Sequence, residues 1–266
     1  MNYNLKIQGT VGKKILVIGC VHGDELIGQK VINHLRQLKI SGGTLTTVIA
    51  HTKAIKAKKR FIDQDLNRSF PGKAKGNHEE QLALSLLPLI KKADIVLDIH
   101  STTTDTTSAI ILTKVNPSIR KLLITFNPKR VVLMEKKVAK TALTGYCKAG
   151  ISFEYGKDKS ETAFQETLTD ILKILAAHRL VKESKTRKVL AKSQTEYFQV
   201  LGTLNRPAGF KLNKAIKNFL LVRKGELIAS LKTEGQKAPR DFYPLLFGPI
   251  SYKEIWGFMA KKVKRI

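Results

Sequence analysis

The stretch KKILVIGCVHGDELIG (13–28) decides the fold, because it joins a strand to a helix through a short polar loop. Its first half, KKILVIGC (13–20), is a compact, β-branched apolar run that predicts a buried strand. Apolar residues then recur at helical spacing from Ile27 to Leu38, and the turn Ser41-Gly42-Gly43 ends the predicted helix. Strand, loop and helix in this order indicate a βα unit of a parallel sheet.

The same alternation continues along the first two thirds of the chain. Further strands are predicted at 45–50, 93–100, 108–113, 130–134 and 150–155, and helices after the capping residue Asn77, at 117–126, near 139–147 and at 161–180. From about residue 183 the pattern changes to short β-like pieces separated by Gly, Pro and Asn. We therefore expect an α/β fold, with a mostly parallel or mixed sheet flanked by helices. Its catalytic domain spans 1–183, and a small all-β C-terminal domain follows at 184–266, after a polar linker at 182–188.

Composition narrows the classes of protein that this chain can belong to. The 266 residues carry 48 Lys+Arg against 21 Asp+Glu, a net charge of +27 that attracts anions of many kinds. No apolar run approaches the ~18 residues of a membrane span, and two isolated cysteines indicate a reducing cytoplasm. The lysines are scattered, without interleaved aromatics, so nucleic acid is not the favoured partner. A basic nucleic-acid or anion-binding protein stays open as an alternative, and so does a homo-oligomer.

Two histidines and one glutamate predict a metal site at one edge of the sheet. His22 and Glu25 follow the first strand at the start of a helix, and His100 ends the strand ADIVLDIH (93–100). The carboxyl ends of parallel strands lie at the same edge, so the three side chains should converge there. Two His and one Glu with an open fourth position is a catalytic zinc pattern, which predicts one Zn²⁺ per chain. Asp98 faces the same side as His100 and is either a supporting carboxylate or a polar rim residue.

The remaining histidines are interpreted as surface or packing residues, although one of them, His51, falls at a strand end. These are His34, His51, His78 and His178.

Basic and acidic residues elsewhere could complete a hydrolytic site. In KKRFIDQDLNRSFPG (58–72), Asn67 beside Arg68 could clamp a substrate carboxylate, and Arg60 could stabilise an oxyanion at the scissile carbonyl. The same stretch also reads as a basic loop with a Pro-Gly turn. Glu154, at the end of the strand in ISFEYG (151–156), is either a general base or an ordinary strand-end carboxylate.

Four motifs in order resemble the succinylglutamate desuccinylase/aspartoacylase family of the zinc carboxypeptidase clan. They are HGDE (22–25), DLNRSFPG (65–72), DIHST (98–102) and FEYG (153–156). The resemblance covers about residues 13–156. It implies His22, Glu25 and His100 as zinc ligands, and Glu154 as general base. It also implies that Arg60 polarises the scissile carbonyl, that Asn67 and Arg68 hold the substrate carboxylate, and that Tyr252, which precedes Phe258 in SYKEIWGF, is an active-site tyrosine.

This chain departs from the family at one substrate-binding position. The resemblance implies an arginine about ten residues before the catalytic glutamate, where this chain has Thr144, with Lys148 nearby as a point charge only. A dicarboxylate substrate such as N-acetylaspartate is therefore in doubt. We expect a deacylase acting on a small anionic N-acyl amino acid. A zinc carboxypeptidase acting on small or cell-wall-type peptides is the runner-up.

Overall fold

The computed structural model describes residues 2–103, 108–139, 141–182, 194–248 and 252–266. The predicted linker at 182–188 and the predicted domain boundary at 183/184 fall almost entirely outside the described residues, so this division of the chain stays a prediction. Within the described residues, no helix is both long enough and apolar enough to cross a membrane.

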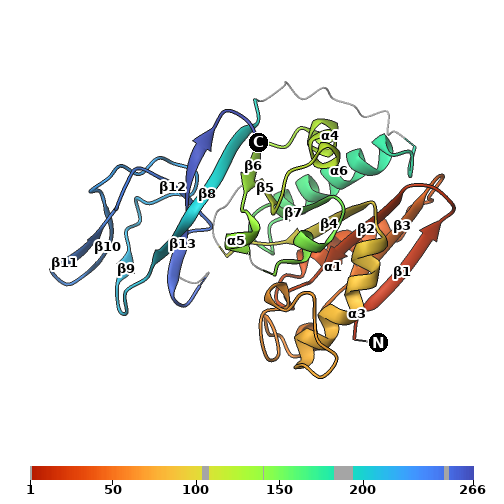
Figure 1. The fold of residues 1–266 in the computed structure, drawn as a ribbon, viewed down its shortest axis with the longest axis horizontal. Coiled ribbons are helices and arrows are strands. Elements are labelled where there is room, and N and C mark those ends of the chain that lie inside the picture. Colours follow the sequence, from red (N-terminus) through yellow and green to blue (C-terminus); the bar gives the residue numbers. More distant parts are fainter. Residues whose placement is uncertain (1, 104–107, 140, 183–193, 249–251) are drawn as a thin grey trace.

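Most of the strands form one ten-stranded mixed sheet in the order β1-β3-β2-β4-β7-β5-β6-β8-β13-β12 (Figure 1). The strands of this sheet are β1 (Asn4–Gly9), β2 (Lys14–Gly19), β3 (Thr44–Ile49), β4 (Ile95–His100), β5 (Ala109–Leu112), β6 (Arg130–Leu133), β7 (Gly150–Glu154), β8 (Glu196–Asn205), β12 (Tyr243–Leu245) and β13 (Ile255–Val263). Strands β3, β2, β4 and β7 run parallel, whereas β5 is antiparallel to β7. The carboxyl ends of β2, β4 and β7 therefore lie together at one edge.

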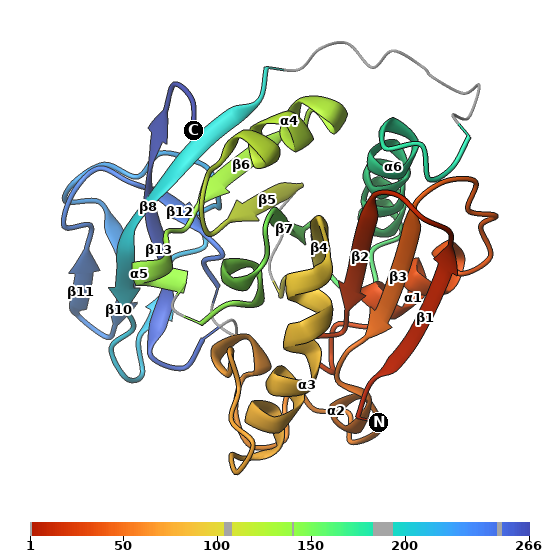
Figure 2. The same ribbon diagram turned by 45° about the vertical axis from the view of Figure 1, so that its right-hand side comes forward.

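The helices cover both faces of this sheet, as the expected α/β class requires. They are α1 (Ile27–Leu35), α2 (Thr52–Lys56), α3 (His78–Lys92), α4 (Pro117–Phe126), α5 (Lys136–Ala139) and α6 (Glu161–Ala177), with 3₁₀ turns η1 (Leu66–Arg68) and η2 (Leu143–Tyr146). Along β2, Ile15 and Val17 join the core under α1, α4 and α6, whereas Leu16 and Ile18 join the core under α3. Helices therefore bury both faces of β2, with α3 on one side of the sheet and α6 on the other (Figure 2), which accounts for the continuous apolar run of this strand.

The capping signal at Asn77 is confirmed. Its side chain accepts a hydrogen bond from the backbone N–H of Glu80, and the Glu80 carboxylate accepts one from the backbone N–H of Asn77, both at 3.0 Å. This capping box fixes where α3 begins. The start of α3 matters for the site, because the loop that precedes it carries Arg60 and Arg68.

The C-terminal region divides between two sheets. Strands β8, β13 and β12 extend the large sheet through the parallel pairing of β6 with β8. Strands β9 (Lys211–Leu212), β10 (Leu227–Leu231) and β11 (Glu234–Lys237) form a separate three-stranded sheet, and the fully buried Trp256 belongs to the cluster packed there. A β-rich C-terminal region is thus confirmed, with part of it continuous with the large sheet.

A close approach between β2 and α1 sets the direction of the loop that carries His22 and Glu25. A Cβ atom at Gly28 would lie 2.8 Å from the Cα atom of Gly19 and 2.9 Å from the backbone nitrogen of Cys20. These are backbone atoms, which cannot move aside cheaply. The helix can therefore start directly against the end of the strand only with glycine at position 28.

We predict that Gly28→Ala lowers the free energy of unfolding by about 1–3 kcal/mol, because the added methyl overpacks this contact. The effect is opposite to helix propensity, which favours Ala over Gly by about 1 kcal/mol. Denaturant unfolding measures it, with Asn33→Ala on the exposed side of α1 as the control, expected within about 0.5 kcal/mol of wild type. A Gly28→Ala protein as stable as wild type would contradict this account of the contact.

Candidate functional site

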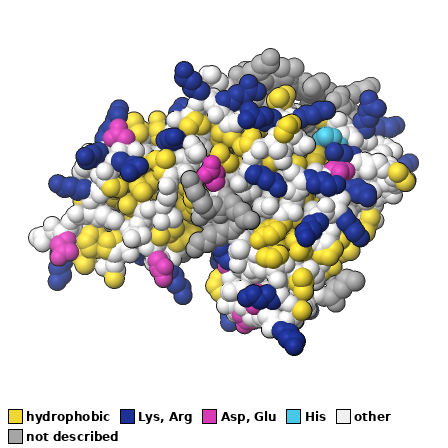
Figure 3. Space-filling view, in the orientation of Figure 1, with side chains coloured by type: hydrophobic (Ala, Val, Ile, Leu, Met, Phe, Trp, Pro, Cys, Tyr) yellow, Lys and Arg dark blue, Asp and Glu magenta, His cyan; other side chains and the backbone are white. Residues whose placement is uncertain are grey.

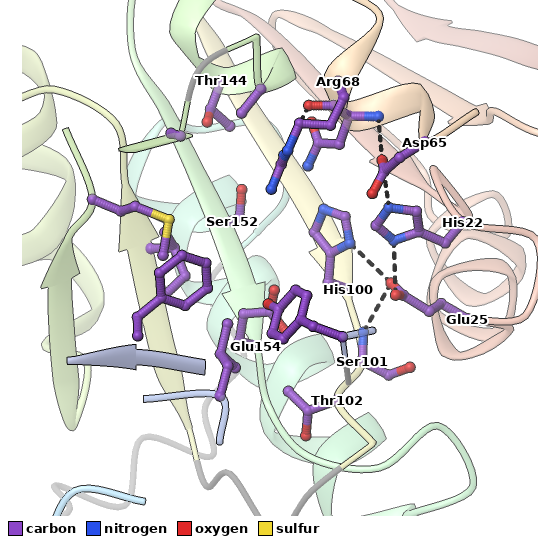
Figure 4. A pocket seen from close by; sticks show the side chains of 18 of the residues that line it. His22, Glu25, Asp65, Arg68, His100, Ser101, Thr102, Thr144, Ser152 and Glu154 are labelled. Carbon is purple, nitrogen blue, oxygen red and sulfur yellow. Dashed lines mark hydrogen bonds and ion pairs between the residues drawn. The ribbon is translucent and has the colours of Figure 1, made fainter. Parts of the chain in front are cut away.

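All eight site residues predicted from the sequence line a single pocket at the carboxyl edge of β2, β4 and β7 (Figure 4). They are His22, Glu25, Arg60, Asn67, Arg68, His100, Glu154 and Tyr252. These residues come from segments as far apart as β2 and the approach to β13. Their convergence is an observation, and the role of each stays a prediction.

The centre of the site is the carboxylate of Glu25, which is 5% exposed. Its Oε1 atom lies 2.8 Å from Nδ1 of His22, and its Oε2 atom lies 2.8 Å from Nδ1 of His100. The backbone N–H of Ser101 also donates to Oε2 at 3.2 Å. One nitrogen of each imidazole therefore faces the same carboxylate, and we call His22, Glu25 and His100 the His–Glu–His cluster.

One further carboxylate lies on the far side of each imidazole. His100 Nε2 lies 2.8 Å from Oδ2 of Asp98, which also accepts a hydrogen bond from the Ser152 hydroxyl at 3.1 Å. His22 Nε2 lies 3.1 Å from Oδ1 of Asp65. Such outer carboxylates orient an imidazole and fix which ring nitrogen carries the proton. For Asp98, the geometry matches the interpretation as a supporting carboxylate, since its side chain is fully buried.

The mutual attraction of these groups outweighs the cost of burying them. Burial alone would raise the pKa of Glu25, but His22 and His100 hold that pKa well below its ordinary value. Burial would lower the pKa of His100, but Asp98 and Glu25 raise it well above its ordinary value, and the pKa of His22 is raised too. The cluster is therefore a strongly polar centre at the edge of the buried strands β2 and β4.

The His–Glu–His cluster fits a divalent metal ion by its donor set. One ligand atom from each residue lies within 4.8 Å of the other two, and all three residues are buried. Two imidazole nitrogens and one carboxylate oxygen are a donor set that Zn²⁺ accepts, and a carboxylate facing two nitrogens at 2.8 Å requires protons or a cation between them. In such a site, the outer carboxylates Asp98 and Asp65 would orient the two histidine ligands.

The loop between α2 and α3 brings Arg60 to the cluster. Its guanidinium donates to Glu25 Oε1 at 2.8 Å and lies 3.1 Å from Nε2 of His22. Asp65 lies in the same loop and caps η1 by accepting the backbone N–H of Asn67 at 2.7 Å. No role for Asp65 follows from the sequence alone. Its only signal was its place at the head of DLNRSFPG, since nothing in the local pattern indicates that it meets His22.

Asn67 and Arg68 form the opposite wall of the pocket. The side-chain oxygen of Asn67 accepts the backbone N–H of Leu143 at 2.8 Å, which leaves the amide NH₂ as the end of the side chain available to a ligand. Arg68 extends toward the centre of the pocket, with its guanidinium also donating to the Asn67 carbonyl at 3.0 Å (Figure 4). An amide donor beside a guanidinium is an arrangement suited to a carboxylate.

Glu154 and Tyr252 approach the cluster from β7 and from the C-terminal region. Glu154 pairs with His100 in the β4–β7 register, and burial raises the pKa of its carboxyl to about 7. A carboxyl with that pKa can exchange a proton with water near neutral pH. Tyr252 packs its ring edge-on to Phe258, at a centroid distance of 5.6 Å, and burial raises the pKa of its hydroxyl above its ordinary value.

The wall between Glu154 and β13 is neutral among the described residues. It contains the small polar side chains of Thr113, Thr144 and Ser152 and an apolar set, namely Ile111, Met134, Ala139, Ala142, Leu246 and Phe258. Lys148 does not line the pocket, and it lies 3.5 Å from the carboxylate of Asp94 instead. Lys148 is therefore not a substitute for a second substrate-binding arginine.

Comparison with known proteins identifies the family. The succinylglutamate desuccinylase/aspartoacylase catalytic domain matches residues 11–180, well over half of the chain. The chain belongs to the succinylglutamate desuccinylase/aspartoacylase family.

The relatives are distant. A probable aspartoacylase from Nostoc sp. is 31% identical over 124 residues, which is 41% of this chain and 42% of that protein. The N-alpha-acetyl-L-2,4-diaminobutyric acid deacetylase of Halomonas elongata is 36% identical over 98 residues, 34% of this chain and 29% of that protein. These matches thus span less than half of each relative. The crystal structure of murine aminoacylase 3 shares the fold, with a TM-score of 0.77 at 21% identity over 94% of this chain and 95% of that one.

Proposed function

We propose that this protein is a zinc-dependent hydrolase that cleaves the amide bond of an N-acyl amino acid. The observation that carries the proposal is the meeting, in one pocket, of the His–Glu–His cluster, the carboxyl of Glu154 and the pair Asn67–Arg68. Family membership supports the same reaction class, since relatives carry the names aspartoacylase and deacetylase. Zinc, the individual roles and the substrate are all part of the proposal.

The proposed substrate carries one carboxylate next to the scissile amide. The Asn67 NH₂ group and the Arg68 guanidinium would hold that carboxylate, because together they offer directional donors and a positive charge. Arg60 stands beside Glu25, where it would stabilise the oxygen of the scissile carbonyl as negative charge develops on it. The neutral wall around Thr144 offers no second cation among the described residues, which favours substrates with a single carboxylate.

His22, Glu25 and His100 would hold the zinc ion, which would supply a Lewis acid that acidifies water and polarises a carbonyl group. Glu154 takes a proton from the attacking water, whose oxygen bonds to the carbonyl carbon. When the carbon–nitrogen bond breaks, Glu154 returns this proton to the leaving amine. The partly buried position of Glu154, where desolvation brings its pKa to about 7, suits a group that must both accept and release a proton.

We predict that Glu154→Gln lowers kcat/KM by about 10²–10⁴-fold while the protein keeps its zinc, because the amide cannot accept the proton. Amine release from N-acetyl and N-succinyl amino acids and from short peptides with a free carboxyl terminus measures activity, and metal analysis accompanies each assay. Glu161→Gln, an exposed change on α6, is the matched control and should retain wild-type activity. Chelation should abolish wild-type turnover and zinc should restore it.

The outcomes of this assay separate the candidate functions. Preference for N-acyl amino acids supports the deacylase, whereas preference for peptides indicates the carboxypeptidase. Zinc-loaded protein that cleaves none of these substrates contradicts the substrate class. Protein that takes up no zinc, but binds nucleic acid with an affinity that collapses as salt is added, contradicts the hydrolase and favours a role for the basic surface, whose lysines and arginines are spread over the face seen in Figure 3.

A second prediction concerns the carboxylate clamp. Asn67→Asp keeps the oxygen that accepts the Leu143 N–H but replaces the NH₂ donor with a negative charge. We expect the KM for N-acyl amino acids to rise about 10- to 100-fold, because a hydrogen bond to a charged group is lost and a like charge is added. Steady-state kinetics measures it. Asn116→Asp, the same change at the cap of α4, should leave KM unaltered. An unchanged KM in Asn67→Asp would remove Asn67 from the clamp.

A further inference from the structure

Glu79 is a completely buried carboxylate in the first turn of α3, outside the pocket. Its Oε1 atom accepts the backbone N–H of Ile62 at 2.6 Å, and its Oε2 atom accepts those of Asp63 at 3.1 Å and Gln64 at 3.2 Å. His51 Nε2 lies 2.8 Å from Oε1. One side chain thus receives three consecutive backbone donors from a loop distant from it in sequence.

These contacts define the charge state of the pair. Burial would raise the pKa of Glu79, but the backbone N–H groups and His51 keep that pKa below its ordinary value, so the carboxylate is ionised. His51 Nδ1 accepts the backbone N–H of Ala54, so the proton lies on Nε2 and points at Glu79. Burial also lowers the pKa of His51, which keeps the ring neutral. Glu79 is therefore the only charged member of the pair.

The loop held by Glu79 is the one that carries the polar groups of the pocket. We call residues 60–68 the clamp segment. Arg60 stands two residues before the first anchored N–H, and Asn67 and Arg68 stand three and four residues after the last one. Within the clamp segment, the Oδ1 atom of Asp65 lies 3.1 Å from Nε2 of His22. The anchor lies between the residue that touches Glu25 and the two residues proposed to bind the substrate carboxylate.

We propose that Glu79 is a positioning residue for substrate recognition: its carboxylate, steadied by His51, fixes the clamp segment and so determines where Asn67 and Arg68 stand. His51 follows β3 and caps α2, and its backbone N–H donates to the carbonyl of Cys20, the residue directly after β2. The contacts of Glu79 and His51 thereby tie the clamp segment to the loop after β2, which carries His22. The anchoring stands by itself, whereas its effect on recognition rests on the proposed function.

The test compares Glu79→Gln with Glu80→Gln in the zinc-loaded full chain. Both changes remove one negative charge from the first turn of α3, but the carboxylate of Glu80 serves the capping box, in which Gln is an accepted substitute, and pairs with Lys73. Both of these partners lie outside the clamp segment. In Glu79→Gln, an NH₂ group replaces one of the two carboxylate oxygens. Because both oxygens accept backbone N–H groups, this NH₂ group must face a donor whichever oxygen it replaces. Hydrogen exchange of the amides in the clamp segment should accelerate at least about tenfold in Glu79→Gln and stay unchanged in Glu80→Gln.

Steady-state kinetics provides a second measurement, whose value does not change when part of the enzyme is unfolded. The ratio of kcat/KM for an N-acyl amino acid to that for its carboxamide analogue is independent of the fraction of folded enzyme. We expect this ratio to fall by up to about 10²-fold in Glu79→Gln, because Asn67 and Arg68 in a displaced clamp segment bind the substrate carboxylate less well. His51→Phe, which removes only one donor to Glu79, should move both readouts in the same direction by less.

The proposal is overturned if both variants, Glu79→Gln and His51→Phe, show wild-type hydrogen exchange in the clamp segment and a wild-type ratio of kcat/KM values. Faster exchange with an unaltered ratio in an active enzyme would overturn the role in recognition. Faster exchange in a protein whose wild type cleaves no substrate would support the anchoring and count against the proposed function instead.

Discussion

The carboxylate of Glu25 is the point to which the rest of the site is tied. Two imidazoles, a guanidinium and a backbone N–H all turn toward this one buried group. A buried carboxylate is costly unless it is paired and hydrogen-bonded, so the chain has to supply these partners from three separate segments. The register of β2 with β4 serves that requirement, because it brings the segments of His22 and His100 to one place, where the loop between α2 and α3 adds Arg60.

The outer shell of the site is built by the same principle. Asp98 and Asp65 hold the histidines from behind, and Glu79 holds the segment from which Asp65 projects. Asp65 and Glu79 each meet an imidazole and backbone N–H groups, and Asp98 meets an imidazole and the Ser152 hydroxyl. Among the described residues, no lysine forms an ion pair with these three carboxylates. The net charge of +27 thus says little about the pocket, where a few buried groups set the local balance of positive and negative charge.

Much of this arrangement could be predicted from local sequence. Buried parallel strands such as β2 and β4 read as uninterrupted apolar runs, and polar residues directly after them lie at the carboxyl edge of the sheet, which is how His22 and His100 could be paired. The capping box at Asn77 could also be predicted, because its two residues lie only three positions apart in the sequence. The prediction of a metal cluster needed only these elements and a glutamate at His-x-x-Glu spacing.

The features that could not be predicted depend on partners distant in sequence. Asp65 and Glu79 look like ordinary loop and helix carboxylates until the fold places them against His22 and His51. Likewise, alternating apolar residues in β8 indicate a strand but do not say that it pairs with β6. The departure at Thr144 was visible in the sequence, whereas the ion pair that draws Lys148 toward Asp94 required the structure.

The most direct test of the account is X-ray absorption spectroscopy of the protein loaded with one equivalent of zinc. We predict one tightly bound ion with two imidazole nitrogens at about 2.0–2.1 Å and otherwise oxygen ligands, and this signature should disappear in His100→Ala but persist in His51→Ala. Failure to bind zinc, sulfur in the first shell, or an unaltered spectrum in His100→Ala would contradict the assignment of His22, Glu25 and His100 as the metal site.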